Sequence, residues 1–442
     1  MTKSFNCKAL RAFRKLGAVA LITATLSIFF AACNQTGGTG GGGGIDDGKP
    51  KHAITFKVEG SNGTLKAIVV DKEINSEDKV EQGKTVTFLA TPDGDYRVKE
   101  WKVDGVVVAG NTSTIYTHVV AKEATVMVSF EPIPPGRAII TLDSVNKKVK
   151  IKVKTRNGSA IQVDGCTETT LASDVETELN ATKGIVILIG HFTEIECNLN
   201  KLTTFSLLDC SFLKKFECTN SQLLVLNIQG CPSLQELDCY KNQLVSLDVK
   251  GLASLQKFDC HGNQLNNLNV HGCSSLQELK CFENQLTILD VKGLNALKNI
   301  DCSKNQLKAI DVQGLVALEV LYCGENRLTE LDVHGLPVLK DLVCSKNQLK
   351  SINILNTASF KYLSCYGNKI KAEAMIEVLK ALPARNASDN VSVTVYTEKS
   401  DEVEENYKDF NNPPELKASF DEAKRKNWRL QKKDASGSVV DI

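Results

Sequence analysis

Nine cysteines recur at a fixed interval of 21 residues through the middle of the chain, without a single insertion. They are Cys197, Cys218, Cys239, Cys260, Cys281, Cys302, Cys323, Cys344 and Cys365. A constant period of this length is typical of a solenoid, in which each repeat is one structural unit. A single unit cannot bury its apolar face, so the period predicts a shared core built by stacking neighbouring coils.

Other residues keep a constant distance from each cysteine. The unit reads L-x-x-L-x-C-x-x-N-x-L, as in the segment from Leu276 to Leu286, and only Ser221 replaces the asparagine. In a short strand, alternate side chains share a face, so the leucine two before the cysteine and the cysteine itself point inward. The positions three before, one before and one after it point outward. We expect the asparagines to pair with backbone groups where the chain turns.

This unit resembles the leucine-rich repeat, with cysteine in the third apolar position. A second apolar triplet follows in each coil, such as Leu244, Leu247 and Val249, and a glycine such as Gly251 closes it. The pattern predicts extended structure on both sides of the coil and little room for helices. We therefore expect a mainly β fold: a flat or gently curved solenoid of about nine 21-residue turns over residues 192–370.

The cysteines of the repeat are predicted to be core residues with free thiols, because a buried thiol acts as a small hydrophobe. Cys210, Cys231 and Cys273 occupy a second core position. Regular spacing in an exported protein also leaves disulfides or a metal open. However, no C-x-x-C pair or Cys/His zinc spacing occurs. We expect no metal and no cofactor, and Cys166 stays unassigned.

The N-terminus has the features of an export signal. Residues 1–15 are basic, an apolar run follows to residue 32, and Cys33 comes directly after two alanines. This arrangement resembles the lipobox of bacterial lipoproteins, which implies a signal peptide over 1–32 and a lipid on Cys33. An ordinary secretory signal or a membrane anchor is the alternative. A glycine-rich tether is expected over 33–50, with the membrane reached only through the lipid.

The segments beside the repeat predict further domains. Residues 51–133 alternate like a small β domain, and the run from Val86 to Pro92 together with Trp101 resembles the internalin-type B-repeat module. That resemblance implies a compact spacer of bacterial surface proteins, with Trp101 in its core. Residues 134–191 are expected to cap the first coil. An α/β cap is expected over 371–442, with helical spacing at 372–382 and 413–426.

Nothing in the sequence predicts an enzyme or a small-molecule substrate. It contains no H-E-x-x-H, G-x-S-x-G, P-loop or dinucleotide fingerprint. Without the signal, 48 Lys and Arg stand against 52 Asp and Glu, so a nucleic-acid partner is not expected either. The candidate functional surface is therefore the outward face of the solenoid.

Two groups of outward residues are candidates for partner binding. The first comprises Tyr240, His261, Phe282, Asp238, Asp259 and Lys280 on consecutive turns. The second comprises Tyr322, Tyr362 and Tyr366, which we expect to form an exposed cluster near the C-terminal end. Alternating charges three residues before the cysteines are expected to pair between strands and to be structural.

The resemblance to leucine-rich-repeat adhesins implies a function. We hypothesise a lipid-anchored protein of the bacterial cell envelope, exposed on the outer membrane, that binds a protein partner on a host or bacterial surface. The first alternative is a lipoprotein that binds carbohydrate or envelope components and faces the periplasm. The second alternative is a structural spacer.

Overall fold

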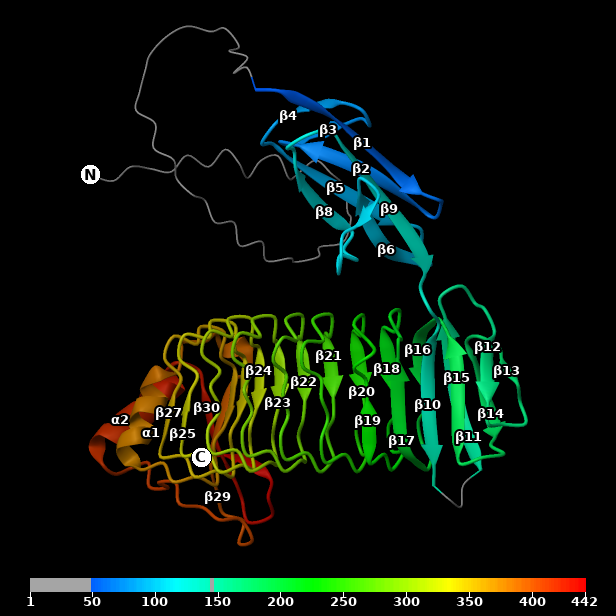
Figure 1. The fold of residues 1–442 in the computed structure, drawn as a ribbon. Coiled ribbons are helices and arrows are strands. Elements are labelled where there is room, and N and C mark those ends of the chain that lie inside the picture. Colours follow the sequence, from blue (N-terminus) through cyan, green and yellow to red (C-terminus); the bar gives the residue numbers. More distant parts are fainter. Residues whose placement is uncertain (1–48, 144–146) are drawn as a thin grey trace, which may run out of the picture. The chain divides into compact units, whose positions relative to one another are not determined.

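The computed structural model describes residues 49–143 and 147–442, and the chain divides into two compact units at residues 131 and 132 (Figure 1). The expected signal peptide, the lipidation site Cys33 and nearly all of the expected tether lie outside the described residues.

The first unit is built from short strands that form two sheets, with the orders β4-β1-β9-β6-β7 and β3-β2-β5-β8. Its strands are β1 (Lys51–Glu59), β2 (Gly63–Val69), β3 (Lys72–Ile74), β4 (Lys79–Glu81), β5 (Thr85–Pro92), β6 (Tyr96–Val103), β7 (Val106–Val107), β8 (Ile115–Val119) and β9 (Ala124–Pro132). Phe88 and Trp101 are fully buried between them. The indole Nε1 of Trp101 donates a hydrogen bond to the carbonyl oxygen of Ser113, at 2.8 Å. Trp101 is therefore a core residue, as the sequence predicted.

Antiparallel strands cover the open end of the first coil in the second unit. They are β10 (Gly136–Leu142), β11 (Lys148–Thr155), β12 (Ile161–Asp164), β13 (Thr170–Leu171), β14 (Val175–Asn180) and β15 (Ile185–Gly190). β11 pairs with the first repeat strand, and β10 pairs with the strand that follows it. The side chains of this segment join the core of the repeat. The backbone edge of the first coil is thereby paired instead of open to solvent.

The repeat forms one long parallel ladder (Figure 1). Its strands are β16 (Phe192–Glu196), β18 (Lys215–Glu217), β20 (Glu236–Asp238), β21 (Lys257–Asp259), β22 (Glu278–Lys280), β23 (Asn299–Asp301), β24 (Val320–Tyr322), β26 (Asp341–Val343) and β28 (Tyr362–Ser364). Each residue pairs with the residue 21 positions later, as Leu237 does with Phe258. The leucine and cysteine columns are buried, so the ladder is a leucine-rich-repeat solenoid with a continuous apolar core.

The second side of each coil is less regular than the sequence predicted. Its strands are β17 (Leu202–Leu208), β19 (Val225–Asn227), β25 (Glu330–Asp332) and β27 (Ser351–Asn353). In the coils between them, side chains such as Leu247 and Val249 are buried, although the backbone forms no continuous ladder. The chain turns directly after this triplet: Asp248 Oδ1 accepts the amide hydrogen of Lys250 at 3.0 Å, and Gly251 then takes a positive φ of 77°.

An asparagine ladder runs through the buried turns that follow the first-side strands. Asn284 Nδ2 donates to the carbonyl oxygens of Cys260 and Cys281, at 3.0 and 3.1 Å. Its Oδ1 accepts the amide hydrogen of Leu265 at 3.0 Å. The same three contacts recur from Asn263 to Asn368. The asparagines therefore satisfy backbone groups that the coil itself leaves unpaired, as the sequence predicted.

The C-terminal segment closes the last coil with helices and strands. Its elements are α1 (Ala372–Ala381), the 3₁₀ turn η2 (Ala387–Asp389), β29 (Ser392–Thr397), α2 (Pro414–Arg425), β30 (Arg429–Lys433) and β31 (Val439–Asp441). β29 and β30 extend the ladder in parallel, and β31 ends it in the antiparallel direction. Asn406 adds one more rung to the asparagine ladder, because its Nδ2 donates to the Cys365 carbonyl at 2.9 Å. The cap thus continues both the sheet and the ladder.

Candidate functional site

The candidate residues of the first group lie on β20, β21, β22 and the turns that follow them. In-register pairing aligns Asp238, Asp259 and Lys280 across the three strands. The next residue of each coil is the buried cysteine, so the residue after it again faces outward. The parallel register thus brings all six predicted residues to one face, which we call the aromatic face.

Three rings stack on one another along the aromatic face. The ring centroids of Tyr240 and His261 are 4.6 Å apart with planes inclined by 10°, and those of His261 and Phe282 are 4.2 Å apart at 8°. The spacing is close to the distance between neighbouring strands. All three side chains are half-buried. Because the rings cover one another's faces, the stack presents mainly ring edges to solvent.

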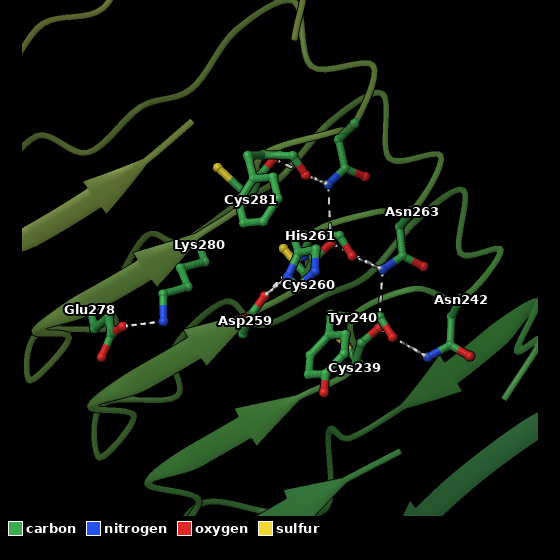
Figure 2. Close-up of polar contacts among 12 residues, drawn as sticks. Cys239, Tyr240, Asn242, Asp259, Cys260, His261, Asn263, Glu278, Lys280 and Cys281 are labelled. Atoms are coloured by element: carbon green, nitrogen blue, oxygen red, sulfur yellow. Dashed lines mark hydrogen bonds and ion pairs between the residues drawn. The ribbon is translucent and has the colours of Figure 1, made fainter. Parts of the chain in front are cut away.

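Hydrogen bonds fix the middle of this stack (Figure 2). His261 Nδ1 lies 2.6 Å from Asp259 Oδ1, and the same oxygen accepts the amide hydrogen of His261 at 3.1 Å. Figure 2 also shows the asparagines on the other side of the same turns, where Asn263 Nδ2 donates to the carbonyl oxygen of Cys260 at 3.0 Å. The aromatic side chains are therefore attached to a backbone that is held from within.

Lysines on this face contact glutamates. Lys257 Nζ lies 3.0 Å from Glu236 Oε1 on the neighbouring strand, as predicted for the alternating charges. Lys215 makes its shorter contact within its own strand, with its Nζ 2.8 Å from Glu217, and a longer one of 3.8 Å to Glu196 on the neighbouring strand β16. Lys280 likewise contacts a glutamate of its own strand, Glu278. The expected pairing between strands is thus only partly realised.

A depression of about 200 Å³ joins these residues into one site. It is lined by Asp238, Tyr240, Lys257, Phe258, Asp259, Glu278 and Lys280. Burial, together with the carboxylates of Asp259, Glu217 and Glu236, raises the pKa of the Asp238 carboxyl group to about 6. Lys257 and Glu278 were assigned to a structural column in the sequence. Both residues stand three positions before a repeat cysteine, and this position faces outward like that of Asp238. The sequence could therefore have assigned Lys257 and Glu278 to this site.

The expected second cluster does not form as one exposed group. Tyr322 is exposed and Tyr362 is half-buried, whereas Tyr366 is only 9% exposed. Lys433 of the C-terminal cap lies over the Tyr366 ring, with its Nζ 4.3 Å from the centroid. The prediction for Tyr366 was wrong because the cap covers the last coil, which the repeat pattern alone does not reveal.

The described cysteines are free, and all but Cys166 are buried. Burial raises the thiol pKa of Cys260, Cys302 and Cys344, which keeps these thiols protonated. Among the described residues, no three His, Cys, Asp or Glu side chains gather in a way that could hold a metal ion. Within the same residues, no helix has both the length and the apolar character that crossing a membrane requires.

Residues 54–134 match the family model of the divergent InlB B-repeat domain, which agrees with the resemblance seen for residues 51–133. A search of curated proteins finds no match.

Two of the solved structures that match the chain come from Listeria monocytogenes and Leptospira interrogans. The functional domain of InlJ from Listeria monocytogenes, which includes a cysteine ladder, is 23% identical with a TM-score of 0.40. The match covers 48% of this chain and 54% of that one, so the chain spans about half the length of that domain. A leucine-rich-repeat protein of Leptospira interrogans is 17% identical with a TM-score of 0.29, covering 53% of this chain and 82% of that one.

Proposed function

We propose that the protein is a lipid-anchored surface protein of the bacterial cell envelope whose solenoid binds a protein partner on a host or bacterial surface. The aromatic stack on the outward face is the observation that carries this proposal. Aromatic side chains are enriched where proteins bind one another, because they bury a large area with few rotatable bonds. Stacking on consecutive coils would also stabilise a spacer, but a spacer has no need of the charged depression beside the three rings.

The construction of the solenoid supports a role in recognition. The core positions repeat almost unchanged, whereas the outward positions vary from coil to coil. The asparagine ladder and the paired ends hold the outward side chains in place before a partner arrives. A preorganised surface loses less conformational entropy on binding. The match of residues 54–134 to the B-repeat domain is consistent with a spacer that precedes this recognition unit.

A double substitution tests the binding surface. Tyr240→Ala together with Phe282→Ala should reduce capture of the solenoid by host or bacterial cell surfaces at least tenfold, on the order expected for two contact aromatics. Val245→Ala together with Ile288→Ala is the matched control, because these side chains are 53% and 72% exposed outside the aromatic face. If cell surfaces capture both double variants equally well, the aromatic face is not the binding site.

The location is tested on intact cells. Protease treatment of unbroken bacteria should release the repeat unit if it is exposed on the outer surface. Complete protection of the repeat until the outer membrane is opened would contradict the proposed location and favour a periplasmic role. Mass spectrometry of the purified protein should find a lipid on Cys33.

A further inference from the structure

The depression on the aromatic face contains the carboxylate of Asp238, which forms no ion pair with the residues that the structure describes. We propose that this face binds a basic segment of the partner protein and that an arginine side chain of this segment pairs with Asp238. The inference rests on the proposed function and specifies the chemistry of the partner.

Among the charged residues of the four strands β18, β20, β21 and β22, Asp238 is the carboxylate that no described lysine or histidine pairs with. Their outward carboxylates are Glu217, Glu236, Asp238, Asp259 and Glu278, and their ammonium groups are Lys215, Lys257 and Lys280. Each lysine contacts one of the glutamates, and Asp259 contacts His261. Within the described residues, the Asp238 carboxylate has no hydrogen-bond or ion-pair partner. The face therefore carries excess negative charge, centred on Asp238.

A guanidinium group fits this position better than an ammonium group. It is planar, can donate two parallel hydrogen bonds to one carboxylate and is less strongly hydrated than an ammonium ion. Tyr240 is the first ring of the aromatic stack and lines the same depression. The aliphatic part of an arginine could lie against these ring edges while its charged end reaches Asp238. Charge and shape thus favour the same side chain.

The groups around Asp238 predict how binding depends on pH. Those that face it are Glu236 on its own strand, Lys215 and Glu217 on β18, Lys257 and Asp259 on β21, and His261 beyond them. Lys280 on β22 also lines the depression. Burial and the carboxylates of Asp259, Glu217 and Glu236 raise the pKa of Asp238 to about 6, and the ammonium group of Lys215 opposes this shift. An arginine binds only the charged form, which dominates at pH 7.5 and is a small fraction at pH 5.0. Its affinity should therefore fall about tenfold between these pH values.

The test uses a fluorescein-labelled peptide, Ser-Gly-Arg-Gly-Arg-Gly-Ser, and its citrulline counterpart. Fluorescence anisotropy with the full-length protein at low salt measures their affinities, because salt screens such contacts. Asp238→Asn should weaken binding of the arginine peptide about tenfold, the loss expected for one charge-assisted pair. The control Glu330→Gln removes an exposed carboxylate in β25, outside the aromatic face, and should change the affinity less than twofold. The affinity of Asp238→Asn for the arginine peptide should also fall much less between pH 7.5 and pH 5.0 than that of the wild-type protein.

Four results would overturn the inference: no binding of the arginine peptide, equal binding of the citrulline peptide, equal effects of Asp238→Asn and Glu330→Gln, or an unchanged pH dependence in Asp238→Asn. Other results distinguish a failure of this inference from a failure of the proposed function. If the Tyr240 and Phe282 double variant loses cell-surface capture while Asp238→Asn keeps it, the binding surface stands without the arginine contact. If no cell surface captures the protein but the peptide requires Asp238, the arginine site stands alone.

Discussion

Replacing Asn284 by alanine is expected to destabilise the solenoid by about 3 kcal/mol. The side chain accepts the amide hydrogen of Leu265 and donates to the carbonyl oxygens of Cys260 and Cys281. Each carbonyl keeps a second donor in the variant, Asn263 for the first and Asn305 for the second. The Leu265 amide loses its partner, and Leu265 is fully buried.

The magnitude follows from these contacts. An unpaired buried amide costs roughly 1–3 kcal/mol, and each of the two shared carbonyl bonds contributes roughly 0.5–1.5 kcal/mol. Together these losses amount to roughly 2–6 kcal/mol. Relaxation of the turn offsets part of them, which places the expected value in the lower half of this range, at about 3 kcal/mol. A loss of about 3 kcal/mol is a large fraction of the stability of an ordinary domain.

Urea unfolding followed by circular dichroism measures the change, with a reducing agent present to keep the thiols free. Asn267→Ala is the matched control, because Asn267 is an exposed asparagine in a neighbouring coil, and its loss should cost less than about 0.5 kcal/mol. Repeat proteins can unfold in steps, so the two variants are compared by transition midpoint as well as by free energy. If Asn284→Ala and Asn267→Ala unfold at the same urea concentration, the ladder does not stabilise the fold as argued.

Three further results are expected. Asp238→Asn should stabilise the fold by about 1 kcal/mol at pH 7.5 and leave its stability unchanged at pH 4. The raised pKa of Asp238 means that its charged form is unfavourable in the folded state. The stability of the wild-type protein therefore falls as the pH rises from about 4 to 6, and the variant lacks this fall. A pH-independent difference in urea midpoint would contradict this. Alkylation of the native protein should modify Cys166 slowly, because burial raises its thiol pKa to about 11. The buried repeat cysteines should stay unmodified until urea is added. Disulfides between repeat cysteines, detected by peptide mass mapping, would refute the prediction of free thiols. Asn406→Ala should loosen the C-terminal cap, because Ile370 and Cys365 lose contacts of 2.8 and 2.9 Å; limited proteolysis should then cut after residue 370, and resistance equal to wild type would count against it.

The sequence predicted those parts of the fold in which each coil repeats its neighbour. A strict 21-residue period means that each cysteine, leucine and asparagine has equivalent surroundings, so one coil describes the rest. The candidate site was predictable for the same reason, since parallel in-register strands bring Tyr240, His261 and Phe282 onto one line. The local helices of the cap were also readable from their spacing, as α1 and α2 show.

The period becomes uninformative where a coil has a neighbour of a different kind. Asn406 follows Asn368 by 38 residues, so no repeat analysis could assign it, although it makes the contacts that the next asparagine of the ladder would make. Tyr366 occupies the same position relative to its cysteine as Tyr240, but Lys433 and the cap cover it. A column of equivalent positions therefore predicts a common direction for its side chains, while exposure depends on what packs against each coil. By this reasoning, residues in the middle coils are better candidates for partner binding than those at either end, since their outward face has only equivalent coils beside it.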